Sequence, residues 1–280
     1  MTNLKSFGID DIILLFSRYD DSIPIFFEKK YGAQCFVYPD DRRDKSYIPS
    51  IKPYLWWQFL KDNLSAEQGE YFYMDADVIF REIPDFKKLH NDSHLWFGSN
   101  TEGYLGLDYI HSKGPGYLAS MAEIVGISQE QVDTLRGRSA GAQWLIIHPK
   151  VMYWKKVYKD STRLYRYFTG AERNEVRKHG KGYVPLQKWT AEMWAMLWNM
   201  PLFGIQLEIS LEFDFAFATD PVSRWDEVKI LHNAGITADM KDCFFKGRYF
   251  SRSPFADDLS FVNKQKCSYK YVQALKRVEE

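Results

Sequence analysis

The chain has 280 residues, of which 45% are hydrophobic and 17% aromatic, and its 37 basic and 37 acidic residues give zero net charge. This composition predicts a folded globular protein with a sizeable core and excludes intrinsic disorder. No apolar run approaches the roughly 18–20 residues that a membrane span needs. The three cysteines, Cys35, Cys243 and Cys267, form no C-x-x-C pair. We therefore expect reduced thiols in a cytoplasmic protein rather than a disulfide framework or a zinc site.

The charged residues are unevenly distributed along the chain, although the net charge is zero. Residues 155–188 contain ten Lys or Arg and three Asp or Glu, a net charge of +7 that is balanced by −7 in the rest of the chain. A solvated helical face is one interpretation of this basic segment. Contact with a phosphate backbone is the other, since Tyr165, Tyr167 and Phe168 are interspersed with the cations. A polyanionic partner such as double-stranded DNA is therefore compatible with the neutral total.

The first hundred residues alternate between strand and helix patterns. Residues 11–17, DIILLFS, predict a buried strand of a parallel sheet. Residues 34–38 predict a second strand, and Pro53 opens a predicted helix with a broad apolar face. Residues 71–74, YFYM, predict a third strand. This alternation is typical of a doubly wound, Rossmann-like α/β sheet.

The rest of the chain continues the mixed pattern. Residues 94–99 and 141–149 predict two further strands, and the basic segment predicts helix and loop. The segment TAEMWAMLWNM, 190–200, is strongly helical in pattern. Residues 207–217 alternate partly like a strand, and EVKILHNAG, 227–235, predicts a short strand that runs into a polar turn.

Two carboxylates follow the third predicted strand. The segment YFYMDADVIF, 71–80, places Asp75 and Asp77 one residue apart between apolar runs. Like charges this close raise each other's pKa, and burial adds to the cost. A divalent cation bound by both carboxylates offsets that repulsion. Ligands of such sheets bind beyond the carboxyl ends of the strands, where we also expect Arg18 and Tyr19, which follow the first strand.

The glycine-rich phosphate-binding motifs are missing from the sequence. Neither G-x-G-x-x-G nor G-x-x-x-x-G-K-[ST] occurs, and there is no G-x-S-x-G or H-E-x-x-H. A nucleotide-binding site without a glycine-rich loop must neutralise the phosphate charge in another way, and a cation bound by carboxylates does so. A D-x-D triplet is common in proteins and is weak evidence by itself. Its position directly after an aromatic strand is what favours a metal site over an ordinary polar strand end.

In this context the sequence resembles the GT-A glycosyltransferases, whose D-x-D binds a Mn²⁺ or Mg²⁺ ion on the diphosphate of a nucleotide-sugar. KPYLWWQFL, 52–60, resembles the helix before that motif in glycogenin-like and galactosyltransferase-like retaining members. SAGAQWLII, 139–147, resembles their strand beside the donor sugar, with the usual asparagine replaced, and ILHNAG, 230–235, resembles their histidine–x–x–glycine segment. The pattern covers roughly residues 10–236. It also resembles bacteriophage and large-virus transferases, some of which glycosylate hydroxymethylated DNA bases.

The resemblance implies a metal site that also binds the diphosphate. Asp77 and His232 would be direct metal ligands, and Asp75 would bind the ribose, the metal or both. Gly235 would lie against the diphosphate. Carboxylates together with an imidazole suit Mn²⁺, and the cation would stabilise the departing nucleoside diphosphate. For His232, a merely structural role is the alternative.

The resemblance also implies residues around the donor. Glu192, in the TAEMW segment, would stabilise positive charge near the anomeric carbon or act as a base toward the acceptor hydroxyl. Its place in the first turn of a predicted helix is explained equally well by the helix dipole. Gln143 would hydrogen-bond the sugar hydroxyls, Lys52 would contact a phosphate, and Arg18 and Tyr19 would contact the nucleobase or a phosphate. An ordinary surface position is the alternative for each of these four residues.

Together these features predict one compact GT-A domain with a doubly wound, mixed α/β sheet. Residues 1–100 would form its nucleotide-sugar-binding half, 101–244 its acceptor and catalytic half, and 245–280 a C-terminal helical or loop extension. We predict sugar transfer from a UDP-sugar to a 5-hydroxymethylpyrimidine in phage DNA, with retention of configuration implied by the resemblance alone. A glycan or protein hydroxyl is the alternative acceptor. The alternative functions are a non-catalytic nucleotide- or DNA-binding module and a metal-dependent nucleotidyltransferase.

Overall fold

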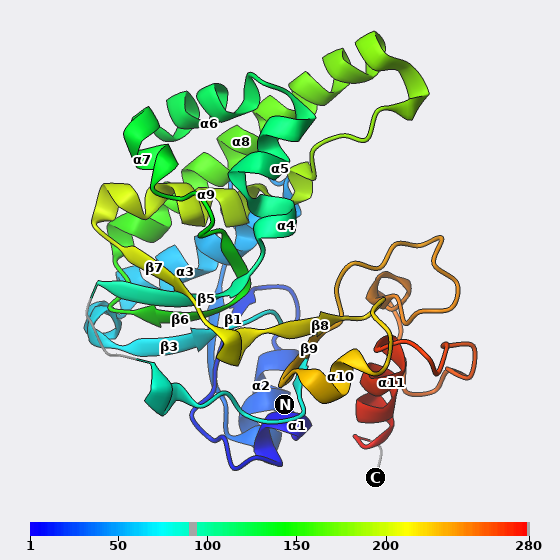
Figure 1. Cartoon of the computed structure of the whole chain (residues 1–280). Coiled ribbons are helices and arrows are strands. Elements are labelled where there is room, and N and C mark those ends of the chain that lie inside the picture. The colour runs from blue at the N-terminus through cyan, green and yellow to red at the C-terminus, as the bar shows by residue number, and fades with distance from the viewer. Residues whose placement is uncertain (90–93, 279–280) are drawn as a thin grey trace. The chain divides into compact units, whose positions relative to one another are not determined.

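The computed structural model describes residues 1–89 and 94–278. The described chain divides into two compact units whose segments alternate along the sequence (Figure 1). Unit 1 comprises Met1–Ile12, Met74–His90 and Ser210–Glu280, and unit 2 comprises Ile13–Tyr73 and Asn91–Ile209. Across the described residues, no helix combines the length and the apolar character that crossing a membrane requires.

Unit 2 contains a mixed four-stranded sheet in the order β3-β6-β5-β7. Strand β6 (Ala140–Ile147) runs antiparallel to both β3 (Glu70–Tyr73) and β5 (Leu95–Asn100), whereas β7 (Gln206–Ile209) runs parallel to β5. A separate parallel pair is formed by β1 (Ile13–Ser17) and β2 (Gln34–Tyr38). The predicted α/β class with a mixed sheet is confirmed.

The first strand differs from its prediction as a strand buried on both faces. All five residues of β1 are only half-buried, because β1 pairs with β2 alone in a two-stranded sheet. An uninterrupted apolar run predicts a strand correctly but does not show how many neighbours will cover it.

Three helices carry most of the aromatic core of unit 2. They are α3 (Ile51–Asp62), α8 (Val151–His179) and α9 (Ala191–Asn199), and α8 packs against both of the others (Figure 1). Trp56 of α3 stacks on Trp154 of α8 with ring centroids 4.9 Å apart. Shorter helices complete the unit: α2 (Ser22–Tyr31), α4 (Glu102–Leu105), α5 (Leu107–Lys113), α6 (Tyr117–Val125) and α7 (Gln129–Asp133). Helix α3 begins two residues before Pro53, which lies in its first turn rather than at its start.

Strand β6 is irregular where it passes β5. The pairing register shifts between Gly98 and Ser99, and Ala142 has a left-handed backbone with φ of 60°. Gly98 is required at this point, since a Cβ there would lie 2.6 Å from the Cβ of Ala140. The irregularity leaves Gln143 fully buried, with its Oε1 accepting a 2.6 Å hydrogen bond from Ser99 Oγ.

Unit 1 is built on a three-stranded sheet in the order β4-β9-β8. Strand β9 (Ile230–His232) is antiparallel to β4 (Val78–Phe80) and parallel to β8 (Phe215–Phe217). The outer edge of β4 is capped by Asn3, whose amide bonds both the N–H and the carbonyl of Phe80. The helices of this unit are α1 (Thr2–Lys5), α10 (Arg224–Glu227) and α11 (Ser268–Lys276).

Most of the predicted elements are confirmed, with two changes of detail. Residues 155–179 of the basic segment belong to one 29-residue helix, α8, and the rest of the segment follows it, while residues 207–217 divide into β7 and β8. Helices α4 to α7, between residues 102 and 133, were not predicted from the sequence. The functional halves divided at residues 100 and 244 stay predictions, and residues 279–280 of the predicted extension lie outside the described residues.

Candidate metal centre

The D-x-D segment and His232 come together because β4 and β9 are paired. Asp75 and Asp77 lie in the turn that leads into β4, and Val78 of β4 faces His232 in the antiparallel register. The N–H of Asn233 donates to the carbonyl of Asp77 over 2.9 Å, which continues the pairing by one step. The last residue of β9 is therefore held beside the turn that carries both carboxylates.

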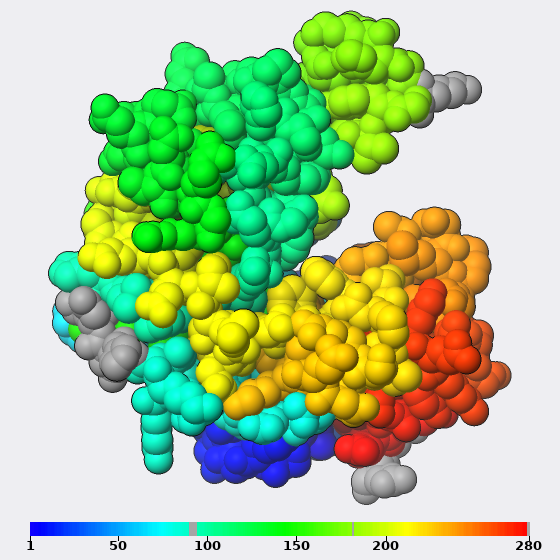
Figure 2. Space-filling model, viewed as in Figure 1, coloured from blue at the N-terminus to red at the C-terminus, as the bar shows by residue number. Residues whose placement is uncertain are grey.

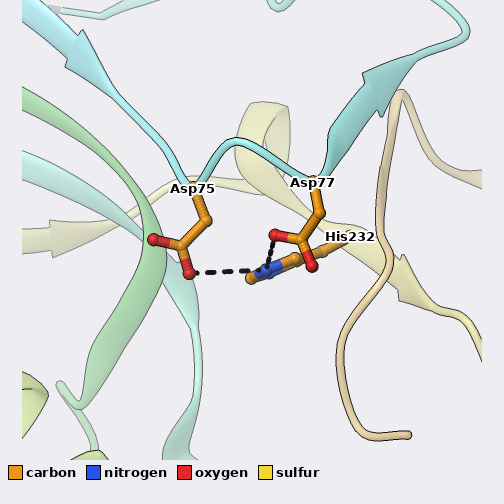
Figure 3. A group of neighbouring side chains, drawn as sticks. All are labelled: Asp75, Asp77 and His232. Atoms are coloured by element: carbon orange, nitrogen blue, oxygen red, sulfur yellow. Dashed lines mark ion pairs between the residues drawn. The ribbon is translucent and has the colours of Figure 1, made fainter. Parts of the chain in front are cut away.

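The three side chains form a compact cluster of possible metal ligands (Figure 3). One ligand atom from each of Asp75, Asp77 and His232 lies within 4.8 Å of the others. Nε2 of His232 is 3.6 Å from Oδ2 of Asp75 and 3.4 Å from Oδ1 of Asp77. Both carboxylates turn toward the imidazole, so the residues singled out in the sequence meet at one point of unit 1.

A lysine from the C-terminal segment places a positive charge beside this cluster. Lys246 Nζ lies 2.6 Å from Oδ2 of Asp77, which is itself only 6% exposed. Burial, the largest single influence, opposes ionisation of Asp77, but its contacts with His232 and Lys246 together outweigh it and lower the pKa of Asp77 to about 2. The carboxylate is therefore charged at neutral pH and available to a cation.

The imidazole of His232 is held by packing rather than by a second hydrogen bond. Its ring lies 6.0 Å from that of Phe215 on β8, and the residue is 6% exposed. Within the described chain, Nδ1 is buried and has no hydrogen-bond partner. Nε2 is thus the ring nitrogen that faces the carboxylates.

This donor set fits a divalent cation. Two carboxylate oxygens and one imidazole nitrogen are ligands that Mn²⁺ accepts, and carboxylates alone also suit Mg²⁺. Three protein ligands leave positions for a substrate, as a catalytic metal requires. The two aspartates and the histidine are the residues that would hold the ion, as predicted from the sequence.

Gly235 follows the cluster in a conformation that favours glycine. Its φ is +76°, in the left-handed region, and a Cβ at this position would lie 3.5 Å from the ring of Phe217. The backbone therefore turns sharply three residues after His232. The predicted contact of Gly235 with a diphosphate stays a prediction.

In unit 2 the structure brings together two other predicted residues, Glu192 and Lys52. Lys52 Nζ lies 2.9 Å from Oε1 of Glu192, which is in the first turn of α9 and 4% exposed. The hydroxyl of Tyr47 contacts Oε2 of Glu192, accepts from its backbone N–H over 2.8 Å and lies 2.8 Å from the carbonyl of Trp189. Lys52 therefore pairs with a buried carboxylate, a partner that the sequence did not predict.

The remaining predicted residues of unit 2 have different surroundings. Gln143 bonds Ser99 through Oε1, while its Nε2 is buried and has no hydrogen-bond partner within the described chain. Arg18 is mostly exposed and lies 3.8 Å from Asp21, and Tyr19 is 97% exposed. Their roles toward sugar, base or phosphate stay predictions.

Two residues at these sites were missed by the sequence interpretation. Lys246 lies in the C-terminal segment and Tyr47 in the loop before α3, and neither was expected at a site. The spacing of 14 residues between His232 and Lys246 matches no sequence motif, and the loop around Tyr47 has no regular pattern. Neither residue carried a sequence signal, since each is brought to its site by distant contacts.

Comparisons with known proteins give little further information. No protein-family model matches the sequence, and no curated protein matches it. One solved structure, titled as that of a glycosyltransferase involved in the glycosylation of the major capsid of PBCV-1, aligns with 81% of this chain and 94% of its own. The TM-score is 0.40 and the sequence identity 10%. A similarity of this size supports no inference about activity.

Proposed function

We propose that this protein is a metal-dependent glycosyltransferase that uses a nucleotide-sugar as donor. The observation that carries the proposal is the clustering of Asp75, Asp77 and His232 at the β4–β9 end of unit 1. The D-x-D before β4 and the histidine–x–x–glycine segment at the end of β9 are also two of the segments in which the sequence resembles GT-A enzymes. Structure and resemblance therefore support the same three ligands.

The chemistry of this site would be the departure of a nucleoside diphosphate. A bound Mn²⁺ or Mg²⁺ would neutralise charge on the diphosphate as the glycosidic bond breaks. Asp77 contributes a carboxylate that stays ionised at neutral pH, and Lys246 places an ammonium group beside it. Gly235 has no side chain, so a phosphate can approach the backbone closely at this point after His232.

The donor and the stereochemistry belong to the proposal as well. We infer a UDP-sugar and retention of configuration from the resemblance to retaining GT-A members. Glu192 would act near the anomeric carbon, with its charge balanced by Lys52 at 2.9 Å. The Nε2 donor of Gln143 is buried and has no hydrogen-bond partner among the described residues, which suits a sugar hydroxyl. Arg18 with Tyr19 would contact the nucleobase or a phosphate.

For the acceptor we propose a 5-hydroxymethylpyrimidine in DNA. The net charge of +7 in residues 155–188 and the resemblance to phage and large-virus transferases support this choice. A glycan or protein hydroxyl is the alternative acceptor. Mass spectrometry of digested DNA from the source organism separates the two, since a glycosylated pyrimidine would be detected directly.

The test of the transferase proposal is nucleotide-sugar turnover with added Mn²⁺. We expect hydrolysis or transfer that releases a nucleoside diphosphate and that is lost in Asp75→Ala and in Asp77→Ala. Asp226→Ala removes an exposed aspartate of the same unit and is the matched control. Activity that survives in both cluster variants would reject the proposal. Nucleotide binding without turnover would indicate a non-catalytic module, and pyrophosphate release from a nucleoside triphosphate would indicate a nucleotidyltransferase.

A further inference from the structure

One face of helix α8 carries a stripe of basic residues. Successive members are separated by three, four or seven positions, and residues at these spacings lie on the same face of an α-helix. The members of this basic stripe are Lys155, Lys159, Arg163, Arg166, Arg173 and Arg177. At about 1.5 Å per residue, the stripe is about 33 Å long.

Four of the six residues of the basic stripe take part in no ion pair within the described chain. Lys155 lies over the ring of Trp57 at 5.5 Å, and the other three, Lys159, Arg173 and Arg177, are exposed. In the last turns α8 extends past α5 and α6, so Arg173 and Arg177 lie on a projecting part of unit 2 (Figure 1). Their charge is therefore directed to solvent or to a ligand.

The acidic residues in the C-terminal half of α8 do not neutralise the basic stripe. Glu172 pairs with Lys188, and Glu175 pairs with Lys178 at 2.8 Å. Neither Lys178 nor Lys188 belongs to the basic stripe. These two acids are thus occupied by other cations, and the positive charge of the stripe remains.

In the N-terminal half the charge is only partly compensated. The buried carboxylate of Asp160 is shared by Arg163 at 3.0 Å and Lys156 at 2.6 Å, so one negative charge faces two positive ones. Arg166 pairs with Asp44 at 2.8 Å, and its side chain is 64% exposed. Exposed pairs of this kind are weak, and a strong anion can displace the carboxylate.

A hollow of about 700 Å³ lies beside the basic stripe. Tyr117 and Tyr167, which contact each other edge to face with centroids 6.1 Å apart, supply aromatic rings to its wall, and Gly170 and Ala171 of α8 line it without bulky side chains. Arg166 belongs both to this hollow and to the basic stripe. Figure 2 shows the last turns of α8 as an exposed lobe next to the α5–α6 segment.

We propose that this surface binds nucleic acid, with phosphates along the basic stripe and one unstacked base in the hollow. Nucleic acid carries closely spaced negative charge, and about 33 Å corresponds to one turn of duplex DNA. Aromatic rings beside a cationic groove suit a flat base. The suggestion that this nucleic acid carries the acceptor rests on the proposed function, whereas the binding itself does not.

The first experiment measures DNA binding by fluorescence anisotropy between 50 and 200 mM salt. The variant Lys159→Gln/Arg173→Gln/Arg177→Gln removes three unpaired charges of the basic stripe. We expect at least about tenfold weaker binding, and a slope of log K against log salt that is smaller by about three. The matched control, Lys29→Gln/Lys61→Gln/Lys87→Gln, removes three exposed lysines elsewhere and should change little. No salt-dependent binding by the wild type, or equal losses in both variants, would overturn the proposal.

The second experiment tests the hollow with a variant that should still fold. Gly170→Leu fills the hollow from a helical position where a Cβ meets no atom within 4 Å and where leucine is a better helix former. We expect a DNA duplex with one unpaired base to bind wild type more tightly than a fully paired duplex. Gly170→Leu should lose this preference and keep the salt slope, and Gly170→Ala should retain both. Equal binding of the two duplexes by wild type would overturn the assignment of the hollow to a base.

Further measurements separate this proposal from the proposed function. Asp75→Ala should abolish nucleotide-sugar turnover and leave DNA binding unchanged, whereas the triple variant of the basic stripe should keep nucleotide-sugar hydrolysis. Heparin provides a polyanion without bases. Binding of heparin as tight as that of DNA, with no effect of Gly170→Leu on DNA, would show a general polyanion surface and contradict the proposal.

Discussion

Asp77 shares its carboxylate between the imidazole of His232 and the ammonium of Lys246, so any metal ion must compete with Lys246. We expect Lys246→Met to tighten Mn²⁺ binding without nucleotide by up to about fivefold, since an ion pair with an exposed lysine is worth at most about 1 kcal/mol. Binding of the nucleotide-sugar should weaken, because the same ammonium lies beside the proposed diphosphate site. Calorimetric titration measures both affinities.

Lys264→Met is the control for this prediction, because Lys264 is an exposed lysine of the same C-terminal segment. It should change neither affinity. Weaker Mn²⁺ binding by Lys246→Met would show that the ammonium does not compete with the metal ion for Asp77.

Tyr47 is a buried residue whose hydroxyl contacts the buried carboxylate of Glu192. It is fully buried, stacks on Tyr165 with centroids 4.4 Å apart, and burial together with Glu192 raises its pKa well above the usual value. Tyr47→Phe leaves the carboxylate and backbone N–H of Glu192 without this partner, so we expect a loss of about 1–3 kcal/mol in the free energy of unfolding. Tyr165→Phe keeps the stacking and should be nearly neutral in the same chemical denaturation experiment. Equal effects of the two variants would show that the hydroxyl contributes nothing.

Among the elements of unit 1, one carboxylate connects the turn at residues 211–213 with two other segments. Glu212 bonds Lys229, just before β9, over 2.7 Å, and it also accepts from Lys88 and from the backbone N–H of Asp85. The hydrogen bond from Lys229 is the main cause that lowers the pKa of Glu212 to about 2. These bonds hold the segment that follows β4 and the residue that precedes β9 in place from the outside.

The lowered pKa predicts how the stability of this unit depends on pH. The pKa of a glutamate in an unfolded chain is about 4.3, so the contribution of Glu212 is complete above that pH and is lost as pH falls toward 2. We therefore expect Glu212→Gln to destabilise the protein at pH 7, with a difference from wild type that shrinks between about pH 4.5 and 2. Glu208→Gln, at an exposed position of β7, should show no such pH dependence. Denaturant unfolding at several pH values provides the measurement.

For the whole molecule, a metal ion bound only by the native protein must stabilise it. Mn²⁺ at about 100 times its Kd should add about 2.7 kcal/mol to the free energy of unfolding. Hydrogen exchange should slow in peptides that cover residues 74–80 and 228–236, where the three ligands lie, and much less at β1 and β2. Asp75→Ala/Asp77→Ala should abolish both effects. Stabilisation that persists in that variant would place the ion elsewhere.

Local pattern was sufficient to predict most of the secondary structure. Apolar and aromatic runs predicted the strands around Phe16, Phe72 and Trp144, because burial of alternate or consecutive side chains is a short-range property of the chain. Helices α4 to α7 were missed. They are short and separated by glycines such as Gly106, Gly114 and Gly126, so no long helical period develops.

The sequence by itself determined the α/β class and the D-x-D turn, and the resemblance added His232 as the third ligand. The tertiary structure decided the partners: Lys246 beside Asp77, Tyr47 and Lys52 around Glu192, and the division of the basic segment into paired and unpaired cations. Neighbouring residues determine which element forms, because propensity and periodicity act over a few positions. Which charges meet depends on strand pairing and helix packing between segments far apart in the chain, and these contacts leave no local pattern to recognise.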